Sequence, residues 1–177
     1  DRPCAEAIKG SYRNGTLNLP RTALVLAEGG SCVMGGSGTL KDGLFFDGEG
    51  VIPMEVVGAF VEELEDARGD IRFTAQVRSR ADRTAVKALF TLQDCAYVIP
   101  YNGQRVYDLN GSIRMDDRRI TCAGITGRLD SGTIKLSGDA ALDDAWRLSD
   151  MHVHAQAKSV PVTIPDTMDL TVDADAA

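Results

Sequence analysis

Aromatic residues are scarce in this chain of 177 residues, where they make up 6% against 44% for hydrophobic residues as a whole. A buried surface built from this sequence is therefore lined mainly by aliphatic side chains. A basic surface is lacking as well, because 26 acidic and 19 basic residues give a formal net charge of -7. Nucleic-acid binding requires basic residues that neutralise phosphates, so we expect no nucleic-acid partner.

Long hydrophobic runs are also missing. No apolar run approaches the roughly 20 residues that span a bilayer, and no basic and then apolar leader opens the chain. We therefore expect a soluble segment. Because it begins abruptly at Asp1 and ends at Ala177 inside the alternating run MDLTVDADAA, we expect it to be a single piece of a longer protein.

The cysteines lack the spacing of a redox or zinc motif. Cys4, Cys32, Cys95 and Cys122 form no CxxC pair, so neither a redox site nor a metal finger is indicated. We interpret them as small buried hydrophobic residues. A disulfide, for instance between Cys95 and Cys122 on neighbouring strands, is the alternative in an oxidising compartment.

Catalytic motifs are lacking too. His152 and His154 flank Val153 and should project from the face opposite the apolar one, but no third metal ligand is evident. No serine lies in a Gly-x-Ser-x-Gly elbow, and the glycine-rich run GGSGTL is not followed by the Lys-Ser/Thr pair of a phosphate loop. We expect a protein that is not an enzyme and that uses no cofactor or metal.

What the sequence does contain is apolar residues at every second position. In residues 106–142 they alternate through short segments that are separated by turns at Asp116-Asp117 and Asp130-Ser131-Gly132. This pattern is typical of a half-buried antiparallel sheet. It predicts a mainly β protein in which one face of a long meander is aliphatic and the other is polar.

The rest of the chain divides into three regions. Residues 1–50 predict short glycine-rich strands, residues 53–67 a helix, and residues 70–177 a repetitive β-meander. The strands expected outside residues 106–142 are Ala7–Lys9, Thr16–Leu19, Ala23–Ala27, Cys32–Met34, Gly38–Phe46, Ile71–Arg78, Val86–Gln93, Ala96–Tyr101, Arg147–Ala157, Val160–Ile164 and Met168–Ala176.

The helix is predicted by a change of period. Apolar residues recur at helical spacing from Met54 to Leu64, with acidic residues on the other side. Pro53 suits the first turn, Glu55 the positive end of the helix dipole, and Gly69 a left-handed C-terminal cap. We expect this amphipathic helix to pack onto the sheet, since its acidic face would be repelled by anionic lipid.

Residues 108–144 and 148–177 resemble the C-terminal region of the TamB family, the inner-membrane subunit of the translocation and assembly module. The resemblance is carried by LNGSI, by ITGRLDSGTIKLSG, by a Val-Pro turn region and by LTVDADAA, and it extends back to about Val51. The family belongs to the AsmA-like, bridge-like lipid transfer superfamily. The resemblance implies a long curved sheet that forms an open trough with an apolar inside, a β-taco.

The resemblance further implies a location and partners. It places the chain in the periplasm, as part of a protein anchored in the inner membrane of a Gram-negative bacterium. Its function would be to carry phospholipid between the two membranes in a hydrophobic groove, in connection with outer-membrane biogenesis, protein assembly and autotransporter secretion. The partners would be phospholipid acyl chains, a TamA-like outer-membrane β-barrel and nascent outer-membrane protein strands.

An aliphatic face without a second layer must either roll upon itself or bind something oily, because exposed apolar surface costs roughly 25 cal/mol per Å². We expect its side chains to line the trough and to shield lipid tails without covalent chemistry. The predicted lining residues are Ile71, Phe73, Val77, Phe90, Leu92, Leu109, Ile113, Met115, Ile120, Cys122, Ile134, Leu136, Leu142, Val153, Val160, Val162, Ile164, Leu170 and Val172.

Three alternatives stay open from the sequence. The lining residues could instead form an ordinary closed core. The chain could be a scaffold whose free strand edges receive outer-membrane β-strands by β-augmentation without carrying lipid. It could also be a closed β-sandwich or an adhesin-like repeat. The lipid class and the direction of transport are not encoded in any recognisable motif.

Overall fold

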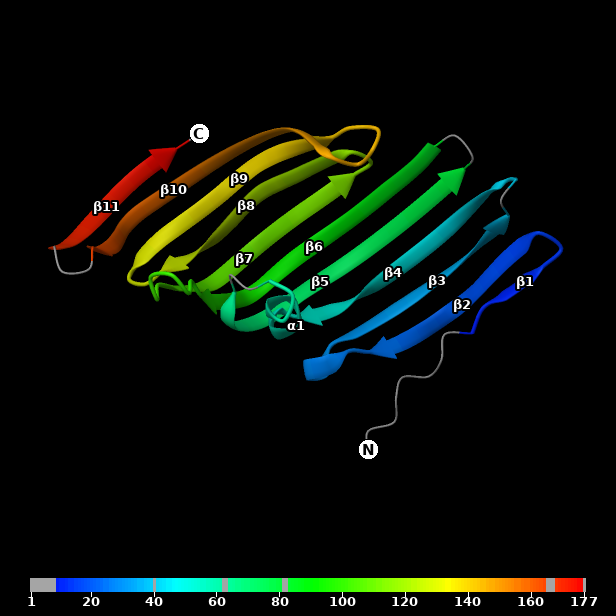
Figure 1. Cartoon of the computed structure of the whole chain (residues 1–177), viewed down its shortest axis with the longest axis horizontal. Coiled ribbons are helices and arrows are strands. Elements are labelled where there is room, and N and C mark those ends of the chain that lie inside the picture. Colours follow the sequence, from blue (N-terminus) through cyan, green and yellow to red (C-terminus); the bar gives the residue numbers. More distant parts are fainter. Residues whose placement is uncertain (1–8, 40, 62–63, 81–82, 165–167, 177) are drawn as a thin grey trace.

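The computed structural model of the chain describes residues 9–39, 41–61, 64–80, 83–164 and 168–176, with the backbone alone for residue 27 and within 162–173. These residues form one antiparallel sheet of eleven strands whose spatial order is the same as their order in the sequence. Figure 1 shows the strands side by side from β1 at one end of the sheet to β11 at the other. The sheet is open and does not close into a barrel, so the all-β meander is confirmed.

The elements follow one another without crossovers. Their bounds are β1 Ser11–Arg13, β2 Thr16–Val25, the 3-10 turn η1 Ala27–Gly29, β3 Ser31–Thr39, β4 Gly43–Pro53, α1 Met54–Gly58, β5 Glu65–Arg80, β6 Arg83–Val98, β7 Arg105–Asp116, β8 Arg119–Leu129, β9 Gly132–Leu142, β10 Leu148–Ile164 and β11 Met168–Ala176.

Several hairpins turn at residues that adopt a positive φ. Asn14 and Gly15 have φ of 50° and 78° between β1 and β2, Asp117 has φ of 54° between β7 and β8, and Asp130 has φ of 51° between β8 and β9. Asn, Asp and Gly are the residues that reach this region at least cost. The two turns expected after β7 and β8 are therefore confirmed.

The strand register separates the side chains into two faces. On β5, the odd positions from Ile71 to Val77 are half-buried and mostly apolar, and the even positions from Arg72 to Arg78 are polar and exposed. Residues that lie opposite each other in neighbouring antiparallel strands share a face. We call the face that carries Ile71, Phe73 and Val77 the apolar face and its reverse the polar face.

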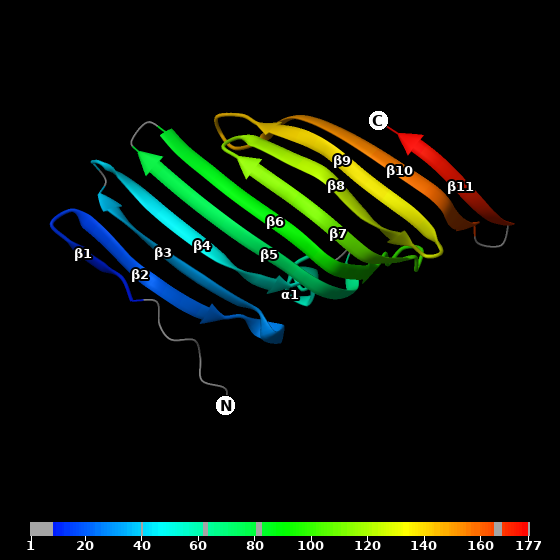
Figure 2. The same cartoon turned by 180° about the vertical axis from the view of Figure 1, so that it is seen from behind.

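A line of β-bulges crosses the middle strands. The register shifts between Arg68 and Asp70 on β5 and between Cys122 and Ile125 on β8. Between these two strands, the bulges contain Asp94 on β6 and Asp108 on β7, with φ of 49° and 53°. Bulges bend a strand and strengthen its local twist. The bulges therefore bend four adjacent strands at the end of the sheet where α1 packs (Figures 1 and 2).

The buried core lies between α1 and this end of the apolar face. Met54 of α1 is 7% exposed and packs with Ala67, Cys95, Val106 and Leu109, which are all buried. Cys95 is the most deeply buried, with 0% exposure. The helix thus covers one end of the apolar face, and the longer part of that face has no helix over it among the described residues.

The helix predicted over residues 53–67 is wrong in its extent. α1 covers Met54–Gly58, and the chain is already in β5 at Glu65. Glu65 pairs with Val98, and Arg68 with Ala96, so pairing to β6 prevails over the helical spacing of apolar residues. Gly69 does not cap a helix, because it lies within β5 with φ of 102°.

The short strands predicted for residues 1–50 are also wrong. β2, β3 and β4 have 10, 9 and 11 residues, and the strand expected over Gly38–Phe46 is divided by the turn between β3 and β4. Gly35, Gly36 and Gly38 continue β3 instead of ending it, whereas Gly29 lies in η1 between β2 and β3. A Cβ atom on Gly36 would lie 2.3 Å from Cδ1 of Phe46, so the missing side chain leaves room for the Phe46 ring.

Other strand boundaries differ as well. Residues 96–98 continue β6, and the two strands expected over Arg147–Ala157 and Val160–Ile164 are one strand, β10, with a bulge between Ala157 and Val160. Lys9 lies outside the strands, and the other residues of the strand expected at Ala7–Lys9 lie outside the described part of the chain.

Candidate functional site: an open apolar face

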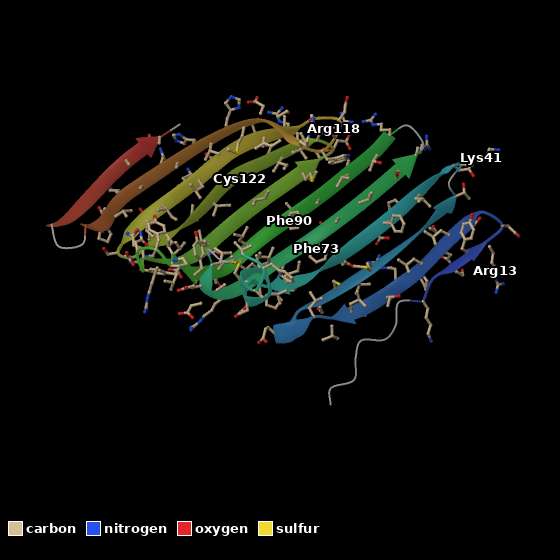
Figure 3. The ribbon with its side chains drawn as sticks, viewed as in Figure 1. Arg13, Lys41, Phe73, Phe90, Arg118 and Cys122 are labelled. Atoms are coloured by element: carbon tan, nitrogen blue, oxygen red, sulfur yellow. The ribbon has the colours of Figure 1, made fainter. Side chains whose placement is uncertain are left out.

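The predicted lining residues lie together on the apolar face. One row across the sheet pairs Phe73 with Phe90, Phe90 with Ile113, Ile113 with Cys122, Cys122 with Gly138, and Gly138 with Val153. Figure 3 labels three members of this row. The same register places on this face Ile71, Val77, Leu92, Leu109, Met115, Ile120, Ile134, Leu136, Leu142 and Val160.

The remaining four predicted lining residues are Val162, Ile164, Leu170 and Val172. Their side chains lie outside the described part of the structure. Their backbones belong to β10 and β11, where Val162 pairs with Leu170.

Two zones can be distinguished on the apolar face. Under α1, Leu109 is 6% exposed and belongs to a closed core, and Ile71, Leu92 and Ile134 pack partly against it. Away from α1, Phe73 and Phe90 are half-buried, with ring centroids 6.4 Å apart. The closed-core alternative therefore applies to the zone under α1, and the open zone is the candidate binding surface.

Sequence reasoning missed several residues of this face. Phe46 pairs with Val77 and Ile52 pairs with Ile71, which extends the face onto β4. Ile125 pairs with Leu136 because the bulge at Gly124 shifts the alternation on β8 by one residue. Continuing the parity of β5 into β4 would have identified the first two, but a bulge leaves no simple mark in the sequence.

The polar face carries cross-strand ion pairs. Arg21 contacts Asp47 at 2.9 Å and Glu49 at 2.8 Å, Lys87 contacts Asp116 at 3.5 Å, and Arg119 contacts Asp139 at 3.4 Å. Exposed pairs of this kind contribute about 0–1 kcal/mol each. They make the polar face a solvated surface, in contrast with its reverse.

Two hollows lie on the polar face. One of ≈ 460 Å³ is bordered by Arg21, Asp47 and Lys87 among others, and a second of ≈ 700 Å³ is bordered by Lys135 and Asp175 among others. Both are lined by polar side chains of neighbouring strands together with apolar atoms of the same strands. The apolar face offers a ligand a broad open surface, and the hollows belong to its reverse.

The histidines lie on the polar face, as expected. His152 pairs with Asp139 across β9 and β10, and its Nδ1 lies 3.8 Å from Asp150. His154 lies 3.4 Å from Asp175 on β11. Within the described ranges, no group of three or more His, Cys, Asp or Glu residues has the arrangement of a metal site.

The cysteines do not pair as suggested. Cys32, Cys95 and Cys122 are free, and Cys4 lies outside the described residues. Cys95 on β6 and Cys122 on β8 are separated by β7, so the disulfide between them is wrong. Burial raises the pKa of the Cys95 thiol, and burial also raises the pKa of Tyr97. A protonated, enclosed thiol suits a packing role.

The fold and its surface define a class: an all-β protein made of one open antiparallel sheet, with one apolar and one polar face. In the part of the chain that the structure describes, no helix has the length and apolar character needed to cross a membrane. No protein-family model matches the chain, and neither the curated proteins nor the solved structures contain a match for it.

Proposed function

We propose that this chain is a periplasmic segment of a TamB-like protein and that its apolar face shields phospholipid acyl chains between the inner and outer membranes. The observation that carries the proposal is the continuity of this face. Apolar side chains from successive strands lie in register across the sheet, and only α1 covers them, at one end, among the described residues. Hydrocarbon on this surface would remove it from water.

The proposed action is binding without bond formation. Acyl chains lie on aliphatic side chains such as Ile113 and Leu136, and the lipid head groups stay in water at the rim. In the same proposal, a TamA-like barrel and nascent outer-membrane protein strands are the protein partners. These assignments are supported by the alternating pattern and by the family resemblance.

A photocrosslinking amino acid tests the proposal directly. We expect a crosslinker at Val153, which lies on the apolar face and is 48% exposed, to label phospholipid in intact cells. The same crosslinker at His152, the adjacent residue on the polar face, is the matched control and should label little lipid. Equal labelling at the two positions would contradict the proposal. Labelling of protein alone at Val153 would favour the scaffold alternative.

A charge placed on the apolar face gives a functional test. We expect Ile113→Asp to slow phospholipid transfer between vesicles by about tenfold, because a carboxylate against hydrocarbon lacks a partner and costs well over the ~1.4 kcal/mol that a tenfold change represents. Thr121→Asp is the control, since it adds the same charge on the polar face, where Thr121 pairs with Arg114. Circular dichroism establishes that both variants are folded. Equal transfer by the two variants would exclude this face as the lipid path.

A further inference from the structure

A third hollow, of ≈ 330 Å³, lies behind the end of the sheet that α1 covers. Ala67 and Val106 belong to the buried cluster under α1. Successive residues of a strand point to opposite faces, so Arg68 and Arg105, which adjoin them, point to the polar face. We call this space the arginine hollow; it is bordered by Asp66, Arg68, Ala96, Tyr97, Val98, Arg105, Val106 and Tyr107.

The arginines around this hollow have no acidic partner. Within the described ranges, the side chains of Arg68, Arg105 and Arg128 form no ion pair and no hydrogen bond. Five other arginines do contact a carboxylate, namely Arg21, Arg83, Arg118, Arg119 and Arg147. In a chain with a net charge of -7, a group of arginines without acidic partners points to an anionic ligand.

Tyr107 holds Arg128 beside the arginine hollow. The Arg128 guanidinium lies over the Tyr107 ring, 5.0 Å from its centroid. The ring is fixed in turn, because the Tyr107 hydroxyl donates a hydrogen bond of 2.5 Å to the carbonyl oxygen of Asp130. A guanidinium that is stacked on a ring keeps the N–H groups of its edge free to donate. The stacking therefore orients Arg128 without using its donors.

We infer that the arginine hollow binds a phosphate ester, with the phosphate group against Arg68, Arg105 and Arg128. These arginines come from three different strands, β5, β7 and β8. A phosphate group suits them better than a carboxylate, because its additional oxygens accept hydrogen bonds from several directions. The organic part of the ester lies on Ala96 and Val98, the half-buried apolar residues of β6 in the hollow.

Asp66 narrows the choice of ester. It is the one acidic residue among the described residues that border the hollow. A carboxylate accepts hydrogen bonds from hydroxyl groups, so an organic part that carries hydroxyls, such as glycerol, has a partner there. A phospholipid head group and a soluble phosphate ester share this chemistry. The inference does not require lipid on the apolar face, because the arginine hollow lies on its reverse.

Calorimetric titration of the whole chain with glycerol 3-phosphate tests the site. The ionic strength is held constant, because salt screens exposed charges. We expect glycerol 3-phosphate to bind more tightly than acetate. The double variant Arg68→Gln with Arg105→Gln should weaken its binding by about tenfold or more, because two charge-assisted donors are lost.

Arg114→Gln is the matched control. Arg114 is an exposed arginine of β7 that lies on the polar face opposite Thr121, outside the arginine hollow. Its replacement should leave the affinity for glycerol 3-phosphate unchanged, and circular dichroism establishes that all variants are folded. Absence of binding, or an equal loss in the double variant and in Arg114→Gln, would overturn the inference. Acetate that binds as tightly as glycerol 3-phosphate would overturn the choice of a phosphate.

Vesicles that contain phosphatidic acid distinguish the two sources of the phosphate. If they displace glycerol 3-phosphate from the wild type, the ligand is a lipid head group. If they do not, the ligand is a soluble phosphate ester. Neither result depends on lipid labelling at Val153, so the binding of acyl chains to the apolar face and the binding of phosphate to the polar face can fail separately.

Discussion

At the scale of single residues, Asp143 has the best-defined electrostatic role. Its carboxylate accepts hydrogen bonds from the backbone N–H groups of Ala145 at 2.8 Å and Arg147 at 2.9 Å, and from the Arg147 side chain at 3.0 Å and 2.9 Å. The hydrogen bond from the backbone N–H of Arg147 is the main reason that the pKa of Asp143 lies below its usual value of 3.8. The charged carboxylate thus stabilises the turn between β9 and β10.

This arrangement predicts a pH dependence of stability. A carboxyl whose pKa is lowered by folding stabilises the protein above its unfolded pKa, and this stabilisation is lost as the pH falls through the lower, folded value. We therefore expect Asp143→Asn to melt at a lower temperature than the wild type at neutral pH, with the difference shrinking below the ordinary carboxyl pKa of 3.8. Thermal melts at several pH values measure this. A difference that persists unchanged into strong acid would contradict the role of the charge.

Individual residues also show what the sequence can and cannot predict. That Cys95 is a small buried hydrophobic residue was predictable from its lack of motif spacing, and the structure confirms it. The suggested disulfide with Cys122 overlooked a strand that the sequence also predicts, because the alternating segment before the turn at Asp116-Asp117 lies between the two cysteines and forms β7. Likewise, the glycine-rich residues 1–50 were expected to form short strands, whereas Gly36 lies inside β3 and leaves space for Phe46.

At the scale of secondary-structure elements, α1 is short and yet central to the packing. Its five residues place Met54 against Cys95, Val106 and Leu109 on the bulged ends of β6 and β7. So short a helix is not stable by itself, and its position depends on this contact. The packing of Met54 therefore couples the connection between β4 and β5 to the sheet.

Truncation of Met54 tests this coupling. We expect Met54→Ala to lower the free energy of unfolding by about 2 kcal/mol or more, because it leaves a cavity in the buried cluster. Phe60→Ala is the control: Phe60 is 84% exposed, so its loss should change the free energy of unfolding by about 0.5 kcal/mol or less. Chemical denaturation of both variants measures the two changes. Similar losses for the two variants would show that α1 does not hold the sheet through Met54.

The helix and the bulges explain why element boundaries were harder to predict than element type. Helical spacing from Met54 to Leu64 is real in the sequence, but β5 pairs with β6 from Glu65 to Arg80 and with β4 from Asp70 to Ser79. Long-range pairing is not visible in a local window. The bulges at Asp94 and Asp108 likewise depend on positive φ values that Asp permits but does not require.

At the scale of the whole molecule, a closed β-sandwich remained an alternative to the open sheet, but alternation was enough to predict a meander with two unlike faces. It succeeded because the period of two is preserved across strands by antiparallel register, so that residues such as Phe90, Ile113 and Leu136 necessarily share a face. The polar-face hollows were not predictable, since they depend on how side chains of several neighbouring strands are arranged in space.

The same distribution of burial predicts how the sheet opens. Cys95, Val106 and Leu109 on the central strands are buried, whereas residues 148–153 of β10 are exposed. Backbone amides exchange slowly where opening must disrupt buried apolar contacts and quickly where it does not. We therefore expect amide hydrogen exchange to be slowest in β6 and β7 beside α1, and faster in residues 148–153 of β10.

Hydrogen exchange followed by mass spectrometry measures this order, with Met54→Ala as an internal comparison. If α1 and the bulged strands form the most stable unit, the variant should lose protection in β6 and β7 first, while exchange in residues 148–153 of β10 stays the same. Uniform exchange across the sheet would instead mean that the strands open as one unit. In that case the apolar face would not have a closed end under α1 and a more mobile open part. The mobile open part is what leaves this face accessible to a ligand.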